Sequence, residues 1–317
     1  MHFSSRTVAA IGIGTSVVLW ASAFTGIRAT LASFSPTDIA FLRVAIASAS
    51  IFACCLLARV RFPAWKSIPR TAAAGLVGIA LYNLLLNHGE LSVSAGAAGF
   101  LGASTPIFAL LLGVLLGGER VRIWGISAVA LSFLGIFIIA AGKPGDFTID
   151  QSALLVIAAA FCLALSFVIQ RPLLSTASPL AVNATMMAFA ALVLAPFAPA
   201  AVRAVTLAPA EAIAAVVYLG LGPSMLAYVT WSFALSHYPV GKASSFLNLA
   251  PIVTLITSYF WLGEIPSFLT VLGGAITIGG VFMANARGRR APTTGTDGGR
   301  MAPVVVHRPH AHTQKGD

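Results

Sequence analysis

Arg43 is the residue of this sequence that most needs a chemical explanation. It lies some six residues inside an apolar segment, and Asp38 and Glu90 are the carboxylates expected near the same end. A charge at that depth is costly and faces protein or a water-filled cavity. One interpretation is an ion pair that locks the first three apolar segments together. The other is an anion anchor or a gate that includes Arg28, with Glu90 as a proton acceptor.

A second group of residues carries hydroxyl, amide and aromatic side chains inside apolar segments. Hydroxyls and amides can bind a polar ligand, and aromatic faces can hold its apolar or cationic part. Each residue taken singly fits helix packing better. Taken together they are our cavity candidates: Trp20, Ser22, Thr25, Tyr82, Asn83, Ser104, Thr105, Tyr228, Trp231, Ser244, Ser245 and Asn248. The set has no charged member, which argues against a strongly ionic ligand such as a phosphate ester.

The sequence offers little for catalysis. An enzyme would gather His, Asp, Glu, Ser or Cys side chains at one depth. His88 and Glu90 form the one close pair, and nothing joins them. The three cysteines fall inside apolar runs and indicate no disulfide framework. We therefore expect no catalytic residue, no metal site and no cofactor.

Composition decides which solvent the chain uses. Of its 317 residues, 58% are hydrophobic and 9% are charged, and the mean hydropathy is +0.92. A soluble chain of this length could not cover its surface with so few charges, so we expect a lipid bilayer around it. The net charge of +10 comes from Lys and Arg in short gaps between apolar runs. This is the pattern of membrane topology and excludes a nucleic-acid surface.

Apolar runs of about 20 residues, the length that spans a bilayer, recur ten times. The expected helices cover 8–31, 37–58, 71–89, 96–117, 122–142, 151–170, 179–198, 211–235, 242–262 and 267–286. We predict an all-α polytopic membrane protein that ends in a disordered basic tail, 287–317. Thr37 or Asp38 can cap the second helix. Three prolines, at 196, 199 and 209, mark a loop.

The positive charges between the helices indicate the orientation. If the connections alternate between the two sides, twelve Lys and Arg fall on one side and two on the other. The first side receives Arg6, Arg59, Arg61, Lys66, Arg70, Arg120, Arg122, Arg171, Lys242, Arg287, Arg289 and Arg290, and the second receives Lys143 and Arg203. Because cytoplasmic loops carry the excess of Lys and Arg, we expect both termini, 1–7 and 287–317, in the cytoplasm.

The two halves of the chain share a pattern at a fixed spacing. The stretch STPIFALLLGVLLGGE (Ser104–Glu119) resembles LAPIVTLITSYFWLGE (Leu249–Glu264), 145 residues later. Nearer the start of each half the spacing is 143, a difference that a loop absorbs. The halves 8–142 and 151–286 then carry five helices each. Because five is odd, the second half runs upside down, which predicts two inverted five-helix repeats.

The repeat also bears on the first apolar run. Ala21-Ser22-Ala23 has the small-residue pattern of a signal-peptidase site, but its counterpart Leu163–Arg171 lies in mid-chain, where no signal peptide can be. We therefore interpret the run as helix one. The charges are not repeated, since Arg43 aligns with Met186 and Glu90 with Leu235. This asymmetry fits a gate on one side.

The motifs resemble a known family. Trp20-Ala-Ser-Ala-Phe24, with Pro106 followed by Gly118-Glu119 and Pro251 followed by Gly263-Glu264, resembles the drug/metabolite transporter superfamily. The bacterial ten-helix branch with two EamA domains is the best match, over residues 8–286. The resemblance implies a carrier coupled to a gradient or to exchange. It also implies a central cavity lined by both halves, with helices five and ten at the periphery.

Two prolines and two glutamates recur in the repeat. Pro106 and Pro251 are expected several residues inside helices four and nine, where each would remove a backbone hydrogen bond and act as a hinge. Glu119 and Glu264 close the same helices, and we interpret them as acceptors for the amino end of the following helix. Glycine pairs such as Gly273-Gly274 allow close helix packing within the chain, and the alternative is a homodimer through helix ten.

These observations favour a secondary transporter that exports a small metabolite or amino acid across the bacterial inner membrane by alternating access. Its expected partners are a small-molecule substrate and the lipid bilayer. The alternatives are a membrane-embedded enzyme and a non-transporting membrane scaffold.

Overall fold

The computed structural model describes residues 4–117, 123–140 and 150–287, and within these ranges every regular element is a helix. Seven helical segments are long and apolar enough to cross a membrane: Ser5–Thr30, Pro36–Leu57, Trp65–Gly89, Ala95–Gly113, Gln151–Ser175, Pro179–Leu207 and Ala210–His237. Three shorter apolar segments cover Ala130–Ile139, Phe246–Leu262 and Phe268–Gly280. The all-helical fold class is therefore confirmed. The count of ten membrane crossings stays a prediction.

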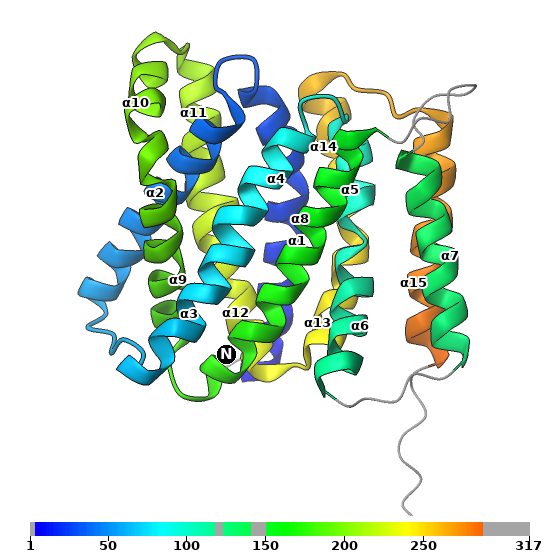
Figure 1. The fold of residues 1–317 in the computed structure, drawn as a ribbon, viewed down its shortest axis with the longest axis horizontal. Helices are drawn as coiled ribbons and strands as arrows, with labels where there is room; N and C mark the ends of the chain where they lie inside the picture. The colour runs from blue at the N-terminus through cyan, green and yellow to red at the C-terminus, as the bar shows by residue number, and fades with distance from the viewer. Residues whose placement is uncertain (1–3, 118–122, 141–149, 288–317) are drawn as a thin grey trace, which may run out of the picture.

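The elements follow one another in the order shown in Figure 1. The first half contains α1 (Ser5–Thr30), α2 (Pro36–Leu57), η1 (Trp65–Ser67), α3 (Ile68–Gly75), η2 (Leu76–Leu81), α4 (Tyr82–Gly89), α5 (Ala95–Gly102), α6 (Thr105–Gly117) and α7 (Ile123–Ala140). The second half contains α8 (Gln151–Gln170), η3 (Arg171–Ser175), α9 (Pro179–Leu194), η4 (Ala195–Phe197), α10 (Ala198–Leu207), α11 (Ala210–Leu219), η5 (Gly220–Leu226), α12 (Ala227–His237), α13 (Val240–Ser244), η6 (Ser245–Leu249), α14 (Ala250–Leu262) and α15 (Phe268–Arg287). Glu119 and the tail beyond residue 287 lie outside the described residues.

Polar residues just before the apolar runs start the helices. Ser35 caps α2, and the side chain of Asp38 bonds back to the Ser35 backbone, which completes a capping box. The expected cap at Thr37 or Asp38 is thus corrected to Ser35, because proline at position 36 fits the first helical turn and places Ser35 just before it. Ser178 precedes Pro179 and caps α9, because its hydroxyl accepts from the backbone N–H of Ala181.

The predicted loop around the prolines at 196, 199 and 209 is wrong. The structure has the 3-10 helix η4 and the helix α10 there. Pro196 and Pro199 occupy the first turns of these two elements, where a backbone N–H has no helical partner to lose. Pro209 is the residue that precedes α11. The prolines therefore divide one helical path into short pieces.

The same rule corrects the prediction for Pro106 and Pro251. Each proline is the second residue of its helix, α6 or α14, and not several residues inside one. The path is already interrupted before it, between α5 and α6 in the first half and by the 3-10 helix η6 in the second. The prolines thus begin a new helix after a break, and no helical hydrogen bond is removed by them.

Two π-helical segments interrupt the third and the eighth predicted spans. They are η2 and η5, and their central residues Gly78 and Pro223 are 145 residues apart. Such wide turns are rare overall, and those that occur are often found at functional sites. Sequence analysis did not predict them.

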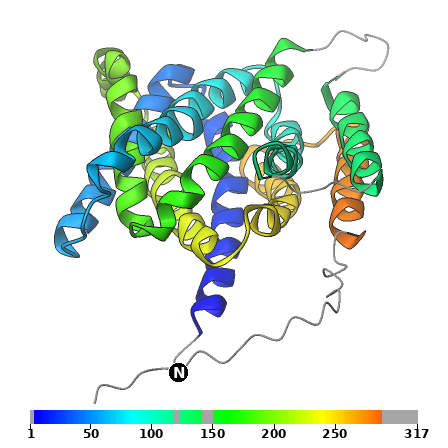
Figure 2. The same cartoon turned by 60° about the horizontal axis from the view of Figure 1, so that its bottom comes forward.

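Elements of the first half pack mainly against elements of the second. The pairs are α1 with α12 and α14, α2 with α9, α3 and α4 with α8, α6 with α8, and α7 with α15. Figure 1 shows α7 and α15 side by side at one edge of the molecule, and the turned view of Figure 2 shows the same pair beside the bundle. The expected peripheral position of helices five and ten agrees with this arrangement.

Glycines allow α7 and α15 to approach closely. A Cβ atom added at Gly273 would lie 2.6 Å from the carbonyl oxygen of Gly135, and one added at Gly274 would collide with the Phe100 ring. The Ser132 hydroxyl donates to the Thr277 carbonyl at 3.2 Å, and the Thr277 hydroxyl donates back to the Ser132 carbonyl at 3.4 Å. Packing within the chain therefore explains Gly273 and Gly274.

Candidate functional site

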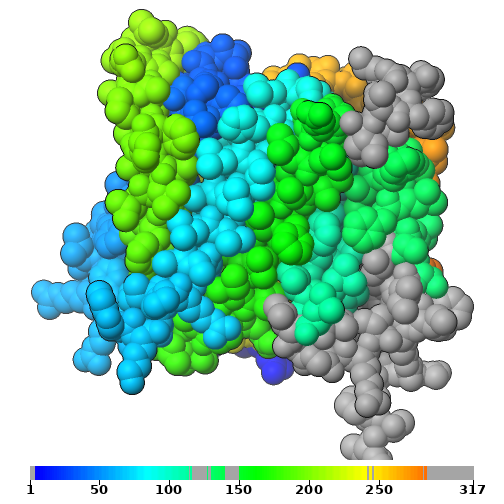
Figure 3. Space-filling model, in the orientation of Figure 1, coloured from blue at the N-terminus to red at the C-terminus, as the bar shows by residue number. Residues whose placement is uncertain are grey.

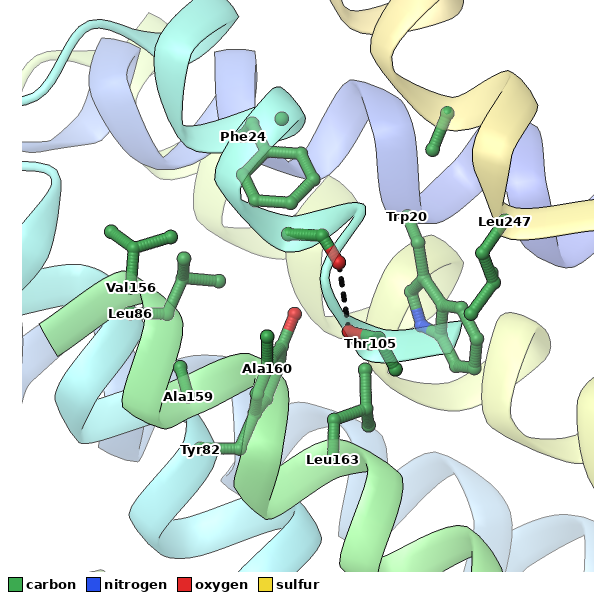
Figure 4. Close-up of a pocket in the computed structure, with 13 residues that line it drawn as sticks. Trp20, Phe24, Tyr82, Leu86, Thr105, Val156, Ala159, Ala160, Leu163 and Leu247 are labelled. Carbon is green, nitrogen blue, oxygen red and sulfur yellow. Dashed lines mark hydrogen bonds between the residues drawn. The ribbon is translucent and has the colours of Figure 1, made fainter. Parts of the chain in front are cut away.

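A small cavity lies at the centre of the helical bundle. Its volume is about 40 Å³, taken as the space open to the centre of a water molecule. It is lined by Trp20, Phe24, Tyr82, Leu86, Gly99, Gly102, Thr105, Val156, Ala159, Ala160, Leu163, Leu247 and Ala250, shown in Figure 4. These residues come from both halves of the chain. In the space-filling view of Figure 3, the side chains of α4 and α8 lie against each other over the middle of the bundle.

Two hydroxyl groups give this cavity its polarity. The Thr105 hydroxyl is occupied, because it donates to the carbonyl oxygen of Gly102 at 2.8 Å. The Tyr82 hydroxyl points toward the middle of the lining side chains in Figure 4. The other lining residues are apolar apart from the Trp20 indole, whose N–H is bonded elsewhere. The cavity therefore suits an apolar group with a single hydrogen bond.

Of the predicted cavity residues, Trp20, Tyr82 and Thr105 line the cavity. Others are used in packing: Ser22 bonds to Tyr218, Thr25 to Thr257, Asn83 to the Ile79 carbonyl, Ser104 to the Leu101 carbonyl and Tyr228 to the Gly78 carbonyl. Trp231, Ser244 and Asn248 are buried outside the lining. The side chain of Ser245 lies outside the described part of the structure.

Sequence reasoning missed the apolar part of the lining. Phe24, Leu86 and Leu247 look like ordinary core residues, and the alanines of α8 look like packing residues. The available signal was Gly99 and Gly102, which stand three residues apart on one face of α5. Glycines on a helix face leave room beside it, but the sequence does not say whether another helix fills that room.

Aromatic rings cluster beside the cavity. Trp20 lies 5.9 Å from Phe167, 5.3 Å from Tyr228 and 5.2 Å from Trp231, measured between ring centroids. Trp231 is fully buried, and its indole N–H has no hydrogen-bond partner. Three of these rings belong to the second half of the chain and one to the first, so the cluster joins the halves.

The π-helical segments bond to this aromatic cluster. The indole N–H of Trp20 donates to the Pro223 carbonyl oxygen in η5 at 3.0 Å. The hydroxyl of Tyr228 donates to the Gly78 carbonyl oxygen in η2 at 2.9 Å. A π-helical turn frees carbonyl groups from the regular ladder, and here each acceptor is satisfied by an aromatic side chain from the other half.

A group of interacting charged residues lies where α1, α4 and α14 end, at the top of Figure 1, which we call the upper end. Arg28 Nε lies 3.5 Å from Glu264 Oε1, and Arg28 Nη1 donates to the carbonyl oxygens of Glu90 and Leu91 at 2.7 and 3.1 Å. Glu264 Oε2 accepts from the backbone N–H of Ala95, at the start of α5. Glu264 thus binds a helix amino end as predicted, although that helix is α5 and not the one that follows.

Arg43 does not pair with Asp38, which was one of its two expected partners. Arg43 Nε donates to the Ser224 hydroxyl in η5 at 2.8 Å. The Asp38 carboxylate accepts instead from the backbone N–H and the hydroxyl of Ser35. The Asp38 carboxylate forms part of the cap of its own helix. Arg43 comes five residues later, so it lies on another face of that helix. Arg43 Nη1 is buried and has no partner.

Glu90, the other expected partner, is fully buried directly after α4. Neither of its carboxylate oxygens has a hydrogen-bond partner, and no nitrogen of Arg43 lies within 4.0 Å of them in the described structure. Burial raises the pKa of the Glu90 carboxyl well above its usual range, and the guanidinium groups of Arg43 and Arg28 oppose the shift. The direct ion pair predicted from the sequence is therefore absent.

The arrangement defines a multi-pass helical membrane protein with a central cavity built by both halves. The EamA-like transporter family model matches residues 7–141 and 151–286. The chain belongs to this family. It is therefore a membrane transporter and not an enzyme, and the alternative of a membrane-embedded enzyme is wrong.

Relatives named as transporters cover most of the chain. A "Probable terminal-alkyne amino-acid exporter" from Streptantibioticus cattleyicolor is 36% identical over 278 residues, 87% of this chain and 93% of the relative. The "Uncharacterized transporter YdfC" of Bacillus subtilis is 36% identical over 264 residues, 83% of this chain and 86% of the relative. A "Probable amino-acid metabolite efflux pump" of Escherichia coli is 22% identical over 84% of this chain and 91% of the relative.

A solved protein crystal structure has the same fold. Its TM-score against this chain is 0.63 at 20% sequence identity, and the match covers 90% of this chain and 100% of that chain. The likeness shows the helical architecture alone.

Proposed function

We propose that this chain is a secondary transporter that exports small metabolites, amino acids among them, across the bacterial inner membrane by alternating access. The observation that carries the proposal is the central cavity, to which α1, α4, α5 and α6 contribute from the first half and α8, η6 and α14 from the second. A site between two halves can open to either side when the halves move against each other. The printed names of the relatives support export and amino-acid compounds.

Ten membrane helices in two inverted five-helix repeats form the proposed scaffold. Several equivalent positions support it. Ser132 and Thr277, which are 145 residues apart, exchange hydrogen bonds as residues beside a two-fold axis would. The π-helical segments and the breaks before α6 and α14 also recur at this spacing.

Contacts at the upper end support a closed state of one entrance. Arg28 of α1 binds Glu264 and the two carbonyl groups that follow α4, and Glu264 also binds the start of α5. The twelve-to-two charge distribution predicts that this end faces the periplasm. In the proposed mechanism these contacts break when the transporter opens outward.

The test is an export screen followed by reconstitution. Cells that overproduce the chain are challenged with amino acids, metabolites and toxic analogues, and the solutes that rescue growth are then followed in proteoliposomes. We expect gradient-dependent movement of at least one solute. An Ala160→Phe variant fills the cavity and should block that movement. The matched control is Ala53→Phe, on the exposed surface of α2, and it should transport normally. Folded protein that moves no solute of the panel would contradict the proposal.

A further inference from the structure

The structure leaves two buried ionisable side chains, one acidic and one basic, without full hydrogen-bond partners. Both oxygens of the Glu90 carboxylate and Nη1 of Arg43 lack hydrogen bonds, and the two side chains are 0% and 2% exposed. Unpaired buried charges are costly, so such groups are normally paired or bind a ligand. Glu90 and Arg43 influence each other electrostatically, but their charged atoms are not within 4.0 Å.

Glu90 and Arg43 are not among the residues that line the cavity, but both are related to it through Tyr82. Tyr82 and Leu86 line the cavity, and Glu90 stands four residues beyond Leu86, so the three positions follow one face of α4 toward the upper end. Arg43 also interacts electrostatically with Tyr82, and its helix α2 packs against α4. The two ionisable groups are therefore both close to Tyr82 and Leu86, on the α4 side of the apolar cavity.

We propose that Glu90 and Arg43 together bind the charged ends of one zwitterionic ligand, an α-amino acid with a small aliphatic side chain that occupies the cavity. Glu90 receives the ammonium group, and the Arg43 fork receives the carboxylate, for which its planar geometry is suited. A ligand with both charges compensates both side chains at once. A ligand with one charge leaves the other side chain unpaired. This inference rests on the proposed export function and assigns its substrate class.

The volume of the cavity limits the size of the side chain that the bound amino acid can carry. Benzene binds an engineered apolar cavity of about 150 Å³, and the volume here is about 40 Å³. An aliphatic side chain of three or four carbons therefore fits better than an aromatic ring. The Tyr82 hydroxyl, which points into the cavity, lies on the same face of α4 as Glu90.

The experiment compares three probes of matched shape on the purified full chain. L-valine carries both charges, isobutylamine lacks the carboxylate and 3-methylbutanoate lacks the ammonium group. Ligand-induced thermal stabilisation gives the concentration for half-maximal effect. We expect L-valine to act at a concentration at least about 10-fold lower than either analogue, which corresponds to about 1.4 kcal/mol. Equal potency of L-valine and 3-methylbutanoate would overturn the assignment of Glu90.

Two variants test which side chain binds which charged group of the ligand. Glu90→Gln should bring L-valine and 3-methylbutanoate within about twofold of each other, and Arg43→Gln should do the same for L-valine and isobutylamine. The matched controls Glu211→Gln and Arg203→Gln remove exposed charges and should keep the full preference. If Arg43→Gln does not fold, the comparison of probes on the unmodified chain still decides.

Transport separates this inference from the proposed function. If proteoliposomes move neutral or singly charged solutes and L-valine neither binds nor competes, export stands and the zwitterion site is wrong. If no solute moves at all while L-valine binds as described, the proposed function fails and the binding site stands. If Glu90→Gln binds L-valine normally and loses only its response to a pH gradient, Glu90 is a proton carrier and the inference is overturned.

Discussion

The Tyr228 hydroxyl donates a 2.9 Å hydrogen bond to the carbonyl oxygen of Gly78. Gly78 lies in the π-helical segment η2 of the first half, and Tyr228 is the second residue of α12 in the second half. Trp20 forms the corresponding bond to Pro223 in η5. The two halves thus hold each other at the positions where their helices depart from regular geometry, next to the cavity. Any movement of one half against the other changes these bonds.

Loss of the Tyr228 hydroxyl should weaken the fold and alter transport. Tyr228→Phe removes this buried hydrogen bond, which costs about 0.5–1.5 kcal/mol of stability. We expect a lower melting temperature in detergent and a changed transport rate. Tyr259→Phe is the control, because Tyr259 is 56% exposed. Melting and transport equal to those of the parent would mean that the bond carries neither stability nor coupling.

Arg28 should matter more for stability than its partner Glu264. Their side chains are 34% and 24% exposed, and ion pairs with such exposure contribute about 0–1 kcal/mol. Glu264→Gln should therefore cost less than about 1 kcal/mol. Arg28→Ala also removes two bonds to carbonyl groups, and hydrogen bonds to a charged group contribute about 1.5–3 kcal/mol. Unfolding in a denaturing detergent series measures both, with Arg203→Ala as the exposed control.

Arg43 and Glu90 should be coupled in stability although they form no direct ion pair. Arg43→Met removes a nearby positive charge that favours the buried Glu90 carboxylate, so we expect a loss of stability smaller than the about 3–5 kcal/mol that breaking a direct buried pair costs. The double variant Arg43→Met, Glu90→Gln should recover most of that loss. Asp38→Asn should cost about 1 kcal/mol through the capping box alone, and its effect should add to that of Arg43→Met. A double variant no more stable than Arg43→Met would show that the two charges act independently.

Pro106 and Pro251 should act through the breaks that precede them. Alanine can extend α6 or α14 backward, because it restores the N–H that proline lacks. We expect Pro106→Ala and Pro251→Ala to remain folded and to transport more slowly. Circular dichroism tests whether the variants remain folded, and flux in proteoliposomes tests whether transport is slower. Undiminished flux in both variants would reduce the prolines to packing residues.

Both termini should be cytoplasmic. A reporter fused after Arg290 that is active only in the cytoplasm should be active, because the connections on that side carry twelve Lys and Arg against two on the other. A second fusion within 143–150 should give the opposite result. Activity of a periplasm-only reporter after Arg290 would reverse the orientation and with it the assignment of the upper end.

Local patterns in the sequence were enough to predict a lipid surrounding, the apolar helices and the repeat. Hydrophobicity and run length depend on neighbouring residues only, so most apolar segments could be predicted within a few residues. The exception is the seventh, expected at 179–198, where the helical path continues to Leu207. The recurrence of Pro106 and Pro251 at one spacing identified the two halves, which the family match over 7–141 and 151–286 also covers. Among the candidate residues, Trp20, Tyr82 and Thr105 line the cavity.

Tertiary packing decided the partners and the lining. Arg43 and Ser224 are separated by 181 residues, and no local pattern links them, whereas the nearby Asp38 was taken by its own helix cap. Gly99 and Ala160 line the cavity because the packing of several helices leaves a space beside them. Ser22 and Thr25 were cavity candidates because they are polar, but their hydroxyls form hydrogen bonds to side chains of other helices. Which buried groups meet and which space stays open depends on how all the helices pack together, and single segments do not contain that information.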